Sequence, residues 1–133
     1  MLLSTTFGEE TKPASVCTPD DLLAAQHIVR HIPVGEAVVD SILRLVRGAR
    51  PGEEGLKDVR DAIAWGPGPR ASQAFMLAVR ARALLEGRLA PSTDDVVALA
   101  HPVLRHRMAL TFPARAEGLT IASVIERLSR SLL

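Results

Sequence analysis

The run ASQAFMLAVRARALLE at residues 71–86 constrains the fold of this chain more than any other feature. Alanine, leucine, methionine, glutamate and arginine have the highest helix propensities, so this run predicts one long helix. Gly87 follows it directly and is a natural helix end, because glycine readily adopts the left-handed conformation found there. Hydrophobic residues make up 47% of the chain, yet it has no Tyr, one Trp and three Phe. A core built from aliphatic side chains and alanine favours packed helices.

Two further helices begin with the same kind of signal, a hydroxyl residue followed by acidic residues. In TPDD, Thr18 is the expected N-cap and Pro19 the first helical residue, because proline needs no hydrogen-bond partner there. This helix should end near residue 31, before Pro33. In STDD, Ser92 is the second expected N-cap, and that helix should cover residues 94–100.

Helical spacing of apolar residues predicts two more helices, at residues 35–47 and 121–132. Pro102 permits a new helix start, so a second short helix is expected over residues 103–108. Short extended segments are expected at 59–65 and 109–112. The fold class is therefore all-α, a bundle of five to six helices with room for one very short strand pair.

The N-terminal residues 1–16 have no clear hydrophobic period and are expected to form an arm or linker. The predicted helical domain then covers residues 17–133. Cys17 is the single cysteine, so an internal disulfide is impossible and a reducing compartment is expected. No apolar run approaches the length of a membrane span, and the N-terminus is unlike a signal peptide. A soluble cytoplasmic protein without membrane contact is the expectation.

Nucleic-acid binding is disfavoured by the formal net charge of +1, which leaves no strong electrostatic footprint. A small helical DNA-binding domain stays an alternative. Its basic contacts would come from Arg80, Arg82, Arg105 and Arg107.

Signals for catalysis or metal binding are weak. His27 and His31 have the spacing of metal ligands on one helix face, but no third ligand accompanies them. His101 and His106 are five residues apart across a proline, and no metal site is predicted there. The chain also lacks a GxxxxGK[ST] loop, a GxGxxG loop and a serine-hydrolase elbow. We therefore predict no catalytic residue and no metal ligand in this chain.

Arg70 is the most informative charged residue, because it comes in the first turn of the strongest predicted helix. The helix dipole disfavours a cation at this end by about 0.3–1 kcal/mol. A phosphate in front of the helix would remove that penalty and would accept hydrogen bonds from the guanidinium. The residues alone fit equally well a surface arginine paired with a nearby glutamate.

Four segments, in this order and spacing, resemble the C-terminal helical lid of MoxR-type AAA+ ATPases. They are GPGPRAS at 66–72, ARALLEGR at 81–88, STDDV at 92–96 and PVLRHR at 102–107. The likeness extends from about residue 18 to the C-terminus. Two mild departures are Pro67-Gly68, where the family usually has alanine or serine nearby, and His101, where proline or an acidic residue is common.

The resemblance implies that Arg70 is the sensor-2 arginine, which reaches the γ-phosphate of ATP. It implies that Gly66, Pro67, Gly68 and Pro69 form the supporting motif. ATP and Mg²⁺, with the Walker A and Walker B residues and the arginine finger, would belong to a large ATPase domain. This chain is expected to be the lid of that longer protein, and so to have no catalytic machinery by itself.

The partners that the resemblance implies are the large domain of the same protein and neighbouring subunits of a ring. A protein with a von Willebrand A domain is a further implied partner. The implied role is chaperone-like remodelling of other proteins or insertion of metal cofactors, driven by lid motion. The alternative is a helical protein-interaction module that never contacts nucleotide, in which Arg70 is an ordinary surface residue.

Overall fold

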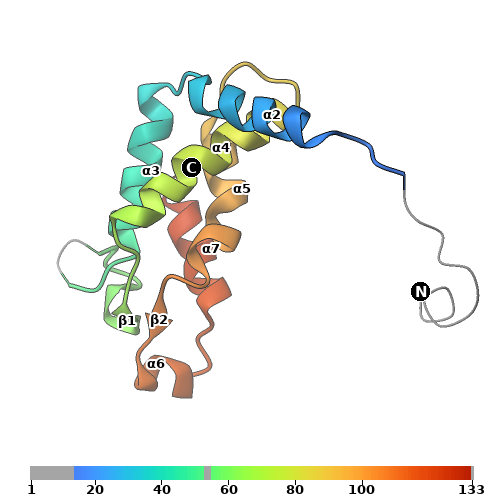
Figure 1. The fold of residues 1–133 in the computed structure, drawn as a ribbon. Coiled ribbons are helices and arrows are strands. Elements are labelled where there is room, and N and C mark those ends of the chain that lie inside the picture. Colours follow the sequence, from blue (N-terminus) through green and yellow to red (C-terminus); the bar gives the residue numbers. More distant parts are fainter. Residues whose placement is uncertain (1–13, 53–54, 133) are drawn as a thin grey trace, which may run out of the picture.

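The computed structural model describes residues 14–52 and 55–132, which fold into helices around one short strand pair (Figure 1). The elements in chain order are α2 (Pro19–His31), α3 (Glu36–Gly48), the 3-10 turn η1 (Arg60–Ala62), β1 (Ile63–Trp65), α4 (Pro69–Leu85), α5 (Thr93–Leu104), β2 (Ala109–Leu110), α6 (Phe112–Ala116) and α7 (Ile121–Arg130). The predicted fold class, all-α with one very short strand pair, is confirmed. The linker predicted at residues 1–16 lies mostly outside the described residues and stays a prediction.

The core forms where α4 crosses α3 and α5, with α7 packed against both α3 and α5 (Figure 1). Its side chains are almost all aliphatic, as the composition predicted, and Phe75 is the buried aromatic among the described residues. The β1–β2 pair is antiparallel, with Ile63 opposite Leu110, and lies with α6 at the opposite end of the molecule from α2 (Figure 1).

The two predicted N-caps close their helices through acidic residues three positions later. Thr18 Oγ1 accepts from the Asp21 backbone N–H at 3.1 Å, and the Thr18 N–H donates to Asp21 Oδ2 at 2.9 Å. The Ser92 N–H donates to Asp95 Oδ2 at 2.8 Å. Each contact satisfies a donor that a helix start leaves without an intrahelical partner.

The prediction of a second short helix after Pro102 was wrong. One helix, α5, runs through Pro102 and ends at Leu104. A proline inside a helix removes one backbone hydrogen bond, which usually disfavours continuation. Here Val103 and Leu104 are buried in the core, and their burial is available only if the helix continues.

The predicted extended segment at 109–112 is shorter than expected, because a helix interrupts it. Strand β2 stops at Leu110, and Thr111 caps α6 by accepting from the Ala114 N–H at 3.4 Å. Helix α6 could not be predicted from the sequence, because its five residues are too few for a recognisable helical period.

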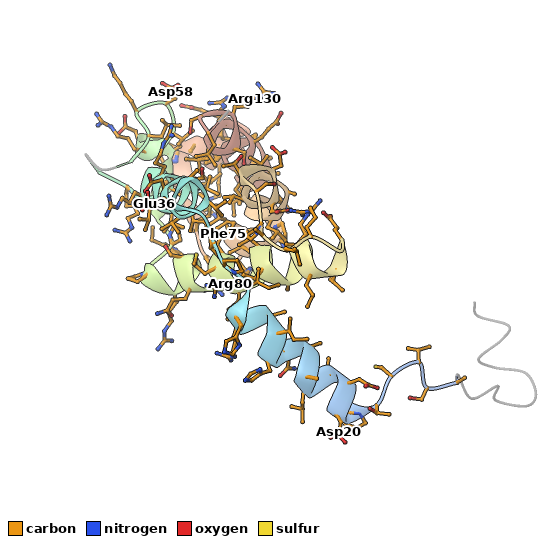
Figure 2. All side chains as sticks on the ribbon, turned by 90° about the horizontal axis from the view of Figure 1, so that it is seen from above. Asp20, Glu36, Asp58, Phe75, Arg80 and Arg130 are labelled. Atoms are coloured by element: carbon orange, nitrogen blue, oxygen red, sulfur yellow. The ribbon has the colours of Figure 1, made fainter. Side chains whose placement is uncertain are left out.

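Helix α2 has the predicted bounds but contributes nothing to the core. None of its residues is buried, and Leu22, Leu23 and Ile28 are 56%, 61% and 52% exposed. Viewed from above, α2 extends away from the other helices on the side of α4 (Figure 2). Local capping and helix propensity explain why α2 is helical, but they leave its apolar side chains uncovered by the described residues.

Candidate functional site

Arg70 lies in the first turn of α4, as predicted from the sequence. Gly68 is the N-cap, Pro69 is the first helical residue, and the first turn has no acidic side chain. Arg70 is exposed, and no hydrogen bond or ion pair joins its guanidinium to any residue in the described ranges. The positive charge is therefore presented to solvent at the helix end where the dipole is also positive.

The loop that leads into α4 is held against the end of α3. Gly66 lies so close to this turn that a Cβ atom added to it would come 2.9 Å from Arg50 Cα, and closer still to the Ala49 carbonyl oxygen. Pro67 is fully buried, and Arg50 Nε donates to its carbonyl oxygen at 3.2 Å. These contacts determine where α4 begins, and therefore where Arg70 stands. We call residues 49, 50, 66 and 67 the loop clamp.

Replacing Gly66 with alanine is expected to destabilise the fold by about 1–3 kcal/mol, because the added methyl group must displace backbone atoms of Ala49 and Arg50, just after α3. Urea unfolding followed by circular dichroism measures this change. Gly68→Ala is the matched control, since a Cβ there meets no atom within 4 Å and its φ of −87° suits alanine. Equal stabilities for the two variants would contradict the close approach at Gly66.

A polar cluster joins the other end of α4 to the start of α5. The Asp95 side chain is almost fully buried and accepts two hydrogen bonds from Arg88, 2.8 Å from Nη1 and 2.6 Å from Nη2. Arg82 Nε lies 3.0 Å from Asp95 Oδ1, an ion-pair contact outside hydrogen-bond geometry. Glu86 accepts from Arg88 Nη2 at 2.6 Å and pairs with Arg82. The cluster fixes the turn between the two helices.

From the sequence, Asp95 was expected only as one of the acidic residues that follow the N-cap Ser92, and its pairing with Arg88 was missed. The hydrogen bonds from Arg88 are the main reason why the pKa of the Asp95 carboxyl lies below its ordinary value, and the Ser92 N–H lowers it further. The same pairing raises the pKa of Arg88. A Gly-Arg pair followed by a capped helix was visible in the sequence, but Arg88 and Asp95 are seven positions apart, and no local rule predicts their contact.

The Asp95 pairing predicts a pH-dependent stability. Because the folded pKa is lowered, the ionised carboxylate stabilises the fold at neutral pH, and this contribution is lost as pH falls below 3.8 through the folded pKa. Asp95→Asn should therefore lower the free energy of unfolding by about 1–3 kcal/mol at pH 7. The difference in this free energy between the variant and the parent should become smaller in acid. Urea unfolding of both proteins between pH 7 and pH 3 measures it. Asp94→Asn, at the exposed neighbouring position, is the control for the loss of an acidic side chain at the start of α5.

Among the described residues, the remaining sequence candidates do not form a metal site. The His27 and His31 rings are 4.4 Å apart, and His31 Nδ1 lies 2.8 Å from the His27 carbonyl oxygen. Residues 14–52 and 55–132 contain no group of three His, Cys, Asp or Glu side chains arranged for a metal ion. Cys17 is exposed. None of the described helices combines the length and the apolar character needed to cross a membrane.

In a comparison with known protein families, residues 56–128 match the AAA lid domain family. The chain is 36% identical over 118 residues to the chaperone MoxR1 of Mycobacterium tuberculosis, covering 88% of this chain and 31% of MoxR1. It is 27% identical over 124 residues to the uncharacterized protein YeaC of Bacillus subtilis, covering 90% of this chain and 36% of YeaC.

A solved structure, that of a candidate ATPase from Cytophaga hutchinsonii, superposes on this fold with a TM-score of 0.77 at 28% identity. The match covers 84% of this chain and 34% of that one. The chain thus spans about a third of the length of the curated relatives and of the solved structure that it matches.

Proposed function

The chain belongs to the AAA lid domain family as a MoxR-like AAA+ lid, and we propose that it senses ATP on a large ATPase domain through Arg70. The observation that carries this proposal is the exposed, unpaired guanidinium in the first turn of α4. In a protein without a ligand in front of this helix, that placement costs free energy. An anion bound there would interact favourably with both the guanidinium and the positive end of the helix dipole.

A phosphate group suits this position chemically. Arg70 would donate charge-assisted hydrogen bonds to phosphate oxygens, and the open first turn of α4 adds the positive end of its dipole. Bound ATP supplies the negatively charged γ-phosphate as acceptor, and Mg²⁺ accompanies it on the large domain. Gly66, Pro67, Gly68 and Pro69 act as the supporting motif, because Gly66 and Pro67 belong to the loop clamp and Gly68 and Pro69 start the helix.

The clamped loop also supports a mechanism in which the lid moves as one body. The loop clamp connects the start of α4, where Arg70 lies, to the end of α3, and α4 itself packs in the core. A displacement of the Arg70 guanidinium would therefore move the whole bundle. With the phosphate present, Arg70 holds the lid closed; without an acceptor, the lid is released. Nucleotide state would in this way set lid position.

The cellular role proposed for the whole protein follows its relatives. MoxR1 is named a chaperone, and a similar remodelling activity is proposed for the ATPase that carries this lid. Its proposed partners are its own large domain, neighbouring subunits of a ring, and a protein with a von Willebrand A domain. A cytoplasmic location is part of the same proposal.

ATP hydrolysis by the ATPase that carries this lid, compared between the parent and Arg70→Ala, tests the proposal. Equal rates would remove Arg70 from nucleotide sensing and favour a lid that works by protein contacts alone.

A further inference from the structure

A shallow apolar groove of about 440 Å³ lies between α2 and α4. Gln26, Val29 and Arg30 line it from α2, and Ala74, Leu77, Ala78 and Ala81 line it from α4. The three alanines have short side chains, so another helix can approach α4 closely. Leu77 is 41% exposed within the groove, and the exposed Leu22, Leu23 and Ile28 lie on α2, the helix that forms its other wall.

The groove lies on the same face of α4 as Arg70. At 3.6 residues per turn, positions 70, 74, 77 and 81 fall within a sector of about 60° around the helix axis. A body that faces Arg70 across this side of α4 therefore also faces the apolar stripe along it. Because the proposed function places a phosphate-bearing domain in front of Arg70, this continuity favours that domain as the occupant over an unrelated partner.

The charge at the groove defines the occupant further. Arg30 lines the groove and has no acidic partner among the described residues. Arg80, labelled close to where α2 meets α4 in Figure 2, has a buried Nε with no hydrogen-bond partner there. A segment that fills this groove would need aliphatic side chains for the alanines and Leu77, and a carboxylate near Arg30.

We propose that the α2–α4 groove docks an amphipathic helix of the ATP-binding domain, with an aliphatic stripe flanked by acidic residues. This inference rests on the proposed function, because it takes the occupant from the position of Arg70. It assigns α2 the role of a docking wall, which accounts for a helix with correct caps and no buried residue.

Cysteine labelling tests the proposal. Leu77→Cys, in a background that contains Cys17→Ser and no other cysteine, is labelled with N-ethylmaleimide in the 133-residue chain and in the ATPase that carries it. Circular dichroism verifies that each protein is folded. The labelling rate at position 77 is expected to be at least tenfold lower in the ATPase. Phe112→Cys is the matched control, because Phe112 is 76% exposed at the far end of the molecule; its rate should differ little between the two proteins.

The outcomes separate docking from nucleotide sensing. Protection at position 77 that persists in Arg70→Ala supports docking even if that variant hydrolyses ATP normally, a result that would reject the sensor role alone. Equal labelling of position 77 in both proteins overturns docking, whatever Arg70→Ala does. Protection that appears in the 133-residue chain alone and grows with its concentration also overturns it, because a second copy then covers the groove.

Discussion

Replacing Arg70 with alanine is expected to slow ATP hydrolysis about tenfold to hundredfold in the ATPase that carries this lid, because the change removes a charge-assisted contact to the γ-phosphate. The stability of the lid should stay unchanged or rise by a few tenths of a kcal/mol, because an exposed cation disappears from the positive end of α4. Steady-state phosphate release and urea unfolding measure the two quantities.

Two control variants distinguish a role of Arg70 in nucleotide sensing from a structural role. Arg105→Ala removes another exposed arginine, at the C-terminal end of α5, and should leave hydrolysis unchanged. Arg70→Lys keeps the charge but loses the two-pronged geometry, so partial activity is expected. If Arg70→Ala lowered hydrolysis only in proportion to a loss of folded protein, the role of Arg70 would be structural and the sensor role would be rejected.

Phe75→Ala is expected to destabilise the fold by about 3–5 kcal/mol, the largest stability change proposed for a single residue of this chain. Phe75 is 0% exposed and has the largest of the fully buried side chains. It lies on α4, five residues after Arg70, so the cavity would loosen the helix that carries the proposed sensor. The midpoint of urea unfolding, with its slope, measures the change.

Leu85→Ala is the matched control for this second prediction. Leu85 also lies on α4 but is 87% exposed, so its loss should change stability by no more than about 0.5 kcal/mol. If both variants lost a similar free energy of unfolding, burial of Phe75 would not be what packs α4 against the core.

The helix starts could be predicted from the sequence because they depend on neighbours. Thr18 with Asp21, and Ser92 with Asp95, close their caps across three residues. Pro69 and Gly87 mark the two ends of α4 through their own backbone preferences, and Gly87 has the positive φ of 71° that was expected of a helix end. The position of Arg70 in the first turn follows from these local rules. Its role as a phosphate sensor came from family resemblance and stays a proposal.

Apart from the short helix α6, the features that could not be predicted depend on burial or on contacts beyond one helical turn. Helix α5 continues through Pro102 because the continuation buries Val103 and Leu104 in the core, which stabilises the fold. Gly66 and Pro67 were assigned to a supporting motif, but their contacts are with Ala49 and Arg50, which follow α3 in the chain.

By itself, the sequence determined where α2, α4 and α5 begin and where α4 places its arginine, because capping, propensity and backbone conformation act within one or two turns. Only the tertiary structure decided which apolar faces are buried, leaving α2 uncovered while α3, α4, α5 and α7 close the core. Burial and long-range hydrogen bonds depend on surfaces meeting in space, and no short stretch of sequence contains both surfaces.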